Sequence, residues 1–202
     1  MKCVVGIDEV GRGCLAGPVV VAAAMVHGDI RNPQLGTLKD SKKLSARQRE
    51  AWFAYFRNNS HITYAVARVY PRRIEALNIS RAANLAAYRA FTKLVKHRAL
   101  SGKKFGTTSI FLDGGLFIKN KKSQPKNAKT IIKGDEKIRA VAIASIIAKV
   151  TRDDFMKRLG KKYPEYGFEI HKGYGTKMHR AAIRRYGPID AHRLTFLGKK
   201  VQ

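Results

Sequence analysis

The chain has 202 residues and a mass of 22.6 kDa, a length that suits one domain. Lysine and arginine number 41 and aspartate and glutamate 14, so the formal net charge is +27, while 45% of the residues are hydrophobic. That hydrophobic content excludes a disordered basic tail, and the charge points to a polyanionic partner, most often nucleic acid and less often an acidic membrane surface.

Several further features exclude other classes of protein. No apolar run approaches the roughly 20 residues of a membrane span. The N-terminus runs into acids at Asp8 and Glu9, which argues against a signal peptide. Two cysteines, Cys3 and Cys14, are too few for a disulfide framework or a metal knuckle. We therefore expect a cytoplasmic protein that makes no membrane contact.

Apolar runs and capping signals predict a mixture of strands and helices. Strands are expected at 2–8, 18–26, 61–70, 109–113 and 130–133, and helices at 45–57, 80–100, 136–159 and 176–186. Short links predict an antiparallel meander for the first three strands, and the later strands should lie parallel to their neighbours through helical crossovers. The fold class is therefore α/β with a mixed, five-stranded sheet. We expect no linker, a core over residues 1–157 and a basic helical extension over 158–202.

Carboxylates stand at the predicted ends of buried strands. Asp8 and Glu9 end the first strand, Asp113 ends the fourth, and Asp135 follows the fifth. A buried carboxylate is costly unless a cation or a metal neutralises it, and ligands gather at the ends of parallel strands. No histidine or cysteine stands at ligand spacing, so the expected ions are Mg²⁺ or Mn²⁺. On a strongly basic protein, such a site indicates two-metal hydrolysis of phosphodiesters.

Each acid also has a purely structural explanation. Asp8 and Glu9 could pair with Arg12. Asp113 could belong to a turn before two glycines, and Asp135 could cap the following helix. What favours a site is the coincidence of these acids at strand ends in a chain that has few acids.

Three loops carry groups suited to nucleic acid. Glycines at 11 and 13, around Arg12, let the backbone approach a substrate closely. Residues 41–43 (Ser41, Lys42, Lys43) offer a hydroxyl and two cations for a phosphate, or else form an exposed turn. In 171–175, Lys172 supplies a cation and Tyr174 could stack on a sugar or base, or simply pack.

Other polar residues receive simpler expectations. Residues 119–129 are rich in lysine and should form a loop. Asp153 and Asp154 are expected on a solvated helix face. His179 and His192 are expected in the basic tail, within reach of phosphate.

Taken together, the motifs of the chain resemble ribonuclease HII, a type 2 ribonuclease H family. The matching segments cover essentially the whole chain in the family's order: GIDEVGRG at 6–13, LAGPVVVAA at 15–23, DSKKLS at 40–45, LNI at 77–79, LDG at 112–114, KGD at 133–135, ASIIAKVTRD at 144–153, YGF at 166–168, HKGYGT at 171–176 and HRLTF at 192–196. Arg12, where the sister family ribonuclease HIII has lysine, and the lack of an extra N-terminal domain favour HII.

The resemblance implies an RNase H-like fold and a metal-dependent endoribonuclease. The enzyme would cleave the RNA strand of RNA–DNA hybrids and cut 5′ of single ribonucleotides embedded in duplex DNA. It would leave 3′-hydroxyl and 5′-phosphate ends. By family motif, the catalytic and metal-binding acids would be Asp8, Glu9, Asp113 and Asp135, which are the acids at the strand ends.

The resemblance also implies how substrate is held. Gly11, Arg12 and Gly13 would contact the 2′-hydroxyl region, the feature that distinguishes RNA from DNA. Tyr174 would stack on the sugar beyond the junction, and phosphates would be held by Lys42, Lys43 and Asn78.

Partners and alternatives complete the prediction. We expect a monomer, and the tail after Phe196 shows no convincing sliding-clamp motif. Two other functions stay open: a non-catalytic nucleic-acid-binding protein, and a different phosphodiesterase of similar fold that cuts only hybrids or cuts DNA.

Overall fold

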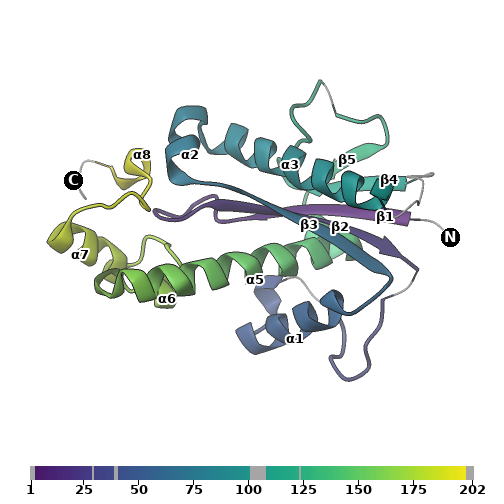
Figure 1. The fold of residues 1–202 in the computed structure, drawn as a ribbon, viewed down its shortest axis with the longest axis horizontal. Coiled ribbons are helices and arrows are strands. Elements are labelled where there is room, and N and C mark those ends of the chain that lie inside the picture. Colours follow the sequence, from purple (N-terminus) through teal and green to yellow (C-terminus); the bar gives the residue numbers. More distant parts are fainter. Residues whose placement is uncertain (1–2, 29, 39–40, 101–107, 123, 199–202) are drawn as a thin grey trace.

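The computed structural model describes residues 3–28, 30–38, 41–100, 108–122 and 124–198. Its centre is a five-stranded sheet in the order β3-β2-β1-β4-β5 (Figure 1). The strands are β1 (Cys3–Val10), β2 (Val19–His27), β3 (Ile62–Val69), β4 (Thr108–Asp113) and β5 (Ala128–Ile131). β2 runs antiparallel to β1 and β3, whereas β4 runs parallel to β1 and β5. The predicted meander and the mixed sheet are thus confirmed.

Helices cover both faces of the sheet (Figure 1). α2 (Pro71–Leu77) leads into α3 (Ile79–Leu100) on one face, and α1 (Ala46–Arg57) and α5 (Arg139–Lys162) lie on the other. Alternate residues of β2 enter the two apolar cores, with Val21 on the α3 side and Ala22 on the α5 side. This two-sided burial explains why β2 is an almost continuous apolar run.

The C-terminal segments gather at one end of the sheet (Figure 1). They comprise η2 (Pro164–Tyr166), α6 (Phe168–His171), α7 (Lys177–Tyr186) and α8 (Leu194–Leu197). Their apolar side chains form a third cluster, which also contains Leu15 and Ala16 from the loop between β1 and β2. None of the helices in the described ranges is long and apolar enough to cross a membrane.

Local sequence signals place several helix ends. Ser45 Oγ accepts a hydrogen bond from Gln48 N at 3.2 Å, and Gln48 Oε1 accepts one from Ser45 N at 2.9 Å. This reciprocal capping box begins α1 at the predicted residue. At α7, the Thr176 hydroxyl accepts from His179 N at 3.3 Å.

The connection between β4 and β5 differs from the expectation. A helical crossover was predicted, but the described residues of 114–127 form turns and loop. Leu116 and Ile118 enter the core on the α3 side, and Phe117 N donates to Asn84 Oδ1 of α3 at 2.9 Å. Two buried apolar side chains anchor the crossing, so a helix is not required. The described residues of the lysine-rich stretch form loop up to residue 127, after which β5 begins.

α5 crosses the sheet unusually closely at Gly6. A Cβ atom added at Gly6 would lie 2.1 Å from the carbonyl carbon of Ala140, which is backbone and cannot rotate away. We therefore expect Gly6→Ala to lower the free energy of unfolding by about 1–3 kcal/mol or more through overpacking. Urea unfolding checks this expectation, and an unchanged midpoint would contradict the close approach.

Candidate active site

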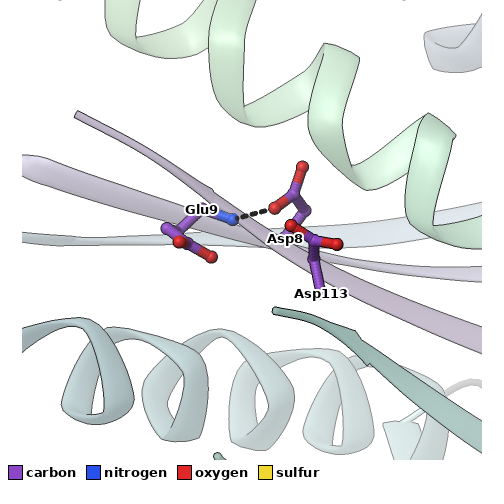
Figure 2. Close-up of side chains that lie close together, drawn as sticks. All are labelled: Asp8, Glu9 and Asp113. Atoms are coloured by element: carbon purple, nitrogen blue, oxygen red, sulfur yellow. Dashed lines mark hydrogen bonds between the residues drawn. The ribbon is translucent and has the colours of Figure 1, made fainter. Parts of the chain in front are cut away.

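Three carboxylates converge near the centre of the sheet (Figure 2). Asp8 and Glu9 occupy adjacent positions of β1, and Asp113 is the last residue of the parallel neighbour β4. One oxygen of each lies within 4.8 Å of the others. Asp8 Oδ1 accepts a hydrogen bond from Glu9 N at 2.7 Å. The first two acids lie inside β1 rather than after it, since the strand continues to Val10.

The fourth predicted acid lies beside this group rather than in it. Asp135 is the second residue of the short helix α4 (Gly134–Lys137), and Lys133 holds the N-cap position, so Asp135 is not the cap. Gly134 N donates to Asp113 Oδ1 at 2.7 Å and places α4 against the acids. Asp135 is buried, with Oδ2 3.6 Å from Lys42 Nζ.

The environment of the acids disfavours their negative charge. Burial raises the pKa of Asp8 well above its usual range, and the Glu9 carboxylate adds to the rise, while a hydrogen bond from Ser145 opposes it. Burial also raises the pKa of Glu9, although Arg12 Nη1 lies 3.2 Å from Glu9 Oε1 and lowers it. Glu9 Oε2 is buried with no hydrogen-bond partner in the described structure.

These observations fit a divalent cation. The donors of the group are carboxylate oxygens, which Mg²⁺ and Mn²⁺ prefer. A cation there would neutralise charges that burial otherwise penalises and would give the orphaned Glu9 oxygen a partner.

The acids open into a cleft of about 270 Å³. Its walls hold most of the predicted substrate-binding residues, together with three that the prediction missed, Val10, Ser145 and Lys149. The lining residues are Asp8, Glu9, Val10, Gly11, Arg12, Gly13, Ser41, Lys42, Asp113, Ser145, Lys149 and Tyr174. The cleft thus combines acids at its base with cations and one aromatic ring at its walls.

Ser41 is a buried residue of the cleft wall, and its hydroxyl contacts another side chain of the protein. The residue begins η1 (Ser41–Lys43) and is buried, and its hydroxyl lies 2.8 Å from the hydroxyl of Ser145. Since Ser145 in turn bonds Asp8, the two hydroxyls form a chain that leads to the acids. This hydroxyl pair therefore orients a carboxylate.

Two buried arginines shape the loop between β1 and β2. Arg152 of α5 donates to the carbonyl oxygens of Pro18, Ala16 and Lys172 at 2.8–3.0 Å. Gly11 has φ +90, and a Cβ atom there would lie 2.3 Å from Arg152 Nε, so only glycine fits.

Arg193 ties the same loop to the C-terminal segments. Its guanidinium donates to Gly17 O at 2.8 and 3.1 Å and to Arg12 O at 2.9 Å. Burial lowers the pKa of Arg193 to about 10. The Gly11–Gly17 loop is therefore fixed from two sides by internal cations.

Tyr174 reaches the cleft from the loop after α6. Gly173 O accepts from Leu15 N at 2.8 Å and joins this loop to the one between β1 and β2. The Tyr174 ring centroid lies 5.9 Å from Lys149 Nζ and 5.9 Å from Arg152 Cζ. Its hydroxyl bonds Cys14, and the side chain remains 42% exposed. The ring therefore lies at the cleft wall and stays partly exposed.

Three predicted substrate-binding residues lie outside the cleft lining. Lys43 Nζ is 3.2 Å from Glu136 Oε1, and Lys172 Nζ donates to the carbonyl oxygen of Glu169. Asn78 ends α2 with φ 65.

The turn that contains Asn78 nevertheless contacts Arg12, a residue of the cleft wall. Its Oδ1 accepts from Arg81 N at 3.0 Å at the start of α3. Arg12 Nη2 donates to Ser80 Oγ of the same turn at 3.3 Å. The turn therefore supports the arginine of the cleft wall.

Some expectations about polar residues are wrong. Asp153 is not solvated but buried, with Oδ1 2.9 Å from Lys149 Nζ, whereas Asp154 is partly exposed. His179 and His192 are buried rather than part of a basic surface. The spacing of Ser145, Lys149 and Arg152 along one helix face was the available signal for the missed residues.

The fold and the site together define a class: a hydrolase with an RNase H-like sheet, carboxylates on two neighbouring parallel strands and a cationic cleft. Comparison with known proteins narrows that class. The family model "Ribonuclease HII" matches residues 5–199. The chain belongs to the ribonuclease HII family and is a metal-dependent ribonuclease H that cleaves RNA paired with DNA.

Individual relatives support the same family assignment. Ribonuclease HII of Bacillus cytotoxicus is 44% identical over 193 residues, which cover 96% of this chain and 68% of the relative. Ribonuclease HII of Christiangramia forsetii is 41% identical over 193 residues, which cover 96% of this chain and 89% of the relative. The RNase HII of Archaeoglobus fulgidus, solved in complex with PCNA, superposes with a TM-score of 0.69 at 26% identity and covers 95% of this chain and 93% of that chain.

Proposed function

We propose that the protein cleaves the RNA strand of hybrids and also cuts duplex DNA 5′ of a single embedded ribonucleotide, leaving 3′-hydroxyl and 5′-phosphate ends. The observation that carries this proposal is the carboxylate group of Asp8, Glu9 and Asp113 at the base of a cleft with an aromatic wall. The acids suit phosphodiester hydrolysis, and the Tyr174 ring suits stacking on a nucleotide beside the scissile bond.

We assign the metal site to these three acids with Asp135 beside them, and two Mg²⁺ or Mn²⁺ ions as occupants. When bound, such ions supply activation of a water and stabilisation of charge on the leaving 3′ oxygen. The chain itself orients the ligands. Glu9 N fixes Asp8, and Gly134 N fixes Asp113, so the carboxylates need little rearrangement.

The cleft walls are proposed to bind the substrate. Residues 11–13 bring backbone close to the 2′-hydroxyl region, and Arg12 and Lys42 face the cleft as cations for the adjoining phosphates. Lys43, Asn78 and Lys172, at the periphery, would hold phosphates further along the duplex. Ser41 contributes by holding Ser145 against Asp8.

The proposal also covers the domain organisation of the chain and its protein partners. We assign the catalytic core to residues 1–157 and substrate binding to the extension 158–202, in a monomeric cytoplasmic enzyme. The Archaeoglobus relative assembles with PCNA. In this chain residues 199–202 of the tail lie outside the described residues, and the tail sequence shows no convincing clamp motif, so no clamp is part of the proposal.

A cleavage assay with three duplexes tests the proposed function. The substrates are an RNA–DNA hybrid, a DNA duplex with one ribonucleotide and uniform DNA, each with Mg²⁺, Mn²⁺ or EDTA. We expect cleavage of the first two with metal, and none of uniform DNA. A binding protein would show steeply salt-dependent binding without nicking. A hybrid-only nuclease would spare the single ribonucleotide, and a DNA-cutting nuclease would cut the third duplex.

Tyr174→Ala is expected to impair cleavage at a single ribonucleotide by about 10- to 100-fold, since stacking contributes about 1–3 kcal/mol per base. Cleavage of long hybrids should fall much less, because the enzyme can bind and cut a long hybrid at many positions. Tyr174→Phe, which keeps the ring, should retain most activity. Tyr88→Ala is the matched control, as that tyrosine of α3 is also 42% exposed. Equal losses on both substrates would contradict the junction role.

A further inference from the structure

Three histidines are stacked inside the C-terminal part of the chain, outside the cleft. They come from α6 (His171), α7 (His179) and the segment before α8 (His192), and all are buried. The rings of His171 and His179 stack with centroids 4.2 Å apart and planes at 17°. The His179 and His192 centroids are 5.3 Å apart. Buried imidazoles require partners for their ring nitrogens, and these partners define the protonation of each ring.

His171 joins the stack to the loop that carries Tyr174. Its Nε2 lies 2.7 Å from the carbonyl oxygen of Tyr166 and must donate a proton to it. Its Nδ1 accepts from Gly173 N at 3.1 Å and must therefore be unprotonated. The ring is neutral, and its backbone carbonyl also accepts from Tyr174 N at 2.9 Å.

His179 and His192 form a directional chain of hydrogen bonds. His179 Nδ1 donates to Tyr174 O at 2.9 Å, so its Nε2 is an acceptor. His192 Nε2 lies 3.2 Å from that atom and must donate. His192 Nδ1 is then left to accept from Ile189 N at 3.0 Å. His192 Nδ1 also lies 3.3 Å from Ile189 O. With both rings neutral, every ring nitrogen and the Ile189 N–H are paired, whereas a second proton on His179 would oppose the His192 Nε2–H unless His192 moved its proton to Nδ1 and left Ile189 N without this acceptor.

The surroundings keep the stack neutral. The rings of Tyr166 and Phe168 pack against the histidines, and the charged neighbours are Arg180 of α7, Glu169 of α6 and Lys172 after it. Burial lowers the pKa of all three histidines, that of His179 to about 4. Near neutral pH the hydrogen-bond directions therefore stay fixed.

We propose that His179 is a positioning residue for recognition of the ribonucleotide junction, acting through its Nδ1–H bond to the Tyr174 carbonyl. The inference rests on the proposed role of Tyr174 in junction cleavage. The His179 bond to Tyr174 O acts together with two bonds to His171: Gly173 N donates to its ring Nδ1 and Tyr174 N donates to its carbonyl oxygen, so both ends of the Gly173–Tyr174 dipeptide are fixed. The Tyr174 ring is thereby held at the cleft wall before substrate arrives.

Two amide variants separate positioning from packing. Asparagine places its amide nitrogen where Nδ1 stood and can still donate to Tyr174, whereas glutamine places it where Nε2 stood. Both variants lose the ring, so their packing losses are similar. We expect His179→Gln to lower single-ribonucleotide cleavage about tenfold, the effect of one buried hydrogen bond, and His179→Asn by less than about threefold. Hybrid cleavage should change by less than about threefold in both.

Equal losses in the two variants, or equal losses on the two substrates, would show that the stack is packing alone and overturn the inference. A measurement on the unaltered protein keeps the test valid even if neither variant folds. Imidazole ¹⁵N NMR at pH 7 should show the Nδ1–H tautomer for His179 and Nε2–H for His171 and His192. A charged His179 or the opposite tautomer would also overturn it. Failure of the wild type to cut at a single ribonucleotide would instead refute the proposed function.

Discussion

Asp8→Asn is expected to lower cleavage of both hybrids and single-ribonucleotide duplexes by at least about 1,000-fold, because the metal contribution of several kcal/mol would be lost. Asp8 is the buried member of the carboxylate group, and its amide replacement keeps the side-chain shape while removing one anionic ligand. The dissociation constant for a hybrid should stay within about threefold of the wild-type value, since the substitution leaves the cations of the cleft wall in place. Single-turnover cleavage and filter binding measure the two effects separately.

The same substitution should not weaken the fold. A buried carboxylate is removed from a group of three neighbouring acids, so we expect the metal-free variant to unfold at the same temperature as the wild type or above it. Thermal unfolding in EDTA checks this. Asp154→Asn is the matched control, because that α5 aspartate is 44% exposed and lies away from the acids. Full activity of Asp8→Asn would remove the basis for the metal assignment.

Arg152→Met is expected to lower the free energy of unfolding by about 3 kcal/mol or more. The side chain is fully buried, and three carbonyl acceptors lose their donor when it is replaced. Each buried acceptor without a partner costs about 1–3 kcal/mol, and the stability of a domain is only about 5–15 kcal/mol. Urea unfolding provides the measurement.

Arg158→Met provides the control for that prediction, since Arg158 is an exposed arginine of the same helix. Its replacement should change the free energy of unfolding by less than about 0.5 kcal/mol. We also expect Arg152→Met to impair cleavage on both substrates, because the loops at residues 11–18 and 171–175 lose their common anchor. Equal stability of the two variants would show that the buried guanidinium contributes no net stabilisation.

Much of the fold could be predicted because its signals are local. The two-sided apolar run of β2 and the capping box of Ser45 and Gln48 depend only on neighbouring residues. The convergence of Asp8 with Asp113 was also predictable, since strands that run parallel bring their carboxyl ends to the same edge.

What could not be predicted depends on contacts between distant residues. In a chain with 41 basic residues, nothing local distinguishes Arg152 and Arg193, whose partners are backbone carbonyls elsewhere. The burial of His179 depends on two other histidines and on aromatic rings of separate segments. α2 was missed because its seven residues are too few for a periodic pattern, although Pro71 marks its start.

The arginine anchors also bear on when the enzyme becomes active during its synthesis. Arg152 and Arg193 bond to carbonyls 134–181 positions earlier in the chain. Such long-range contacts form late, because closing a long loop costs entropy before the contact repays it. A nascent chain that already carries all four acids would therefore lack a finished cleft until residue 193 has left the ribosome. On this view, the order of synthesis delays the nuclease until the C-terminal segment, which we propose binds substrate, is present.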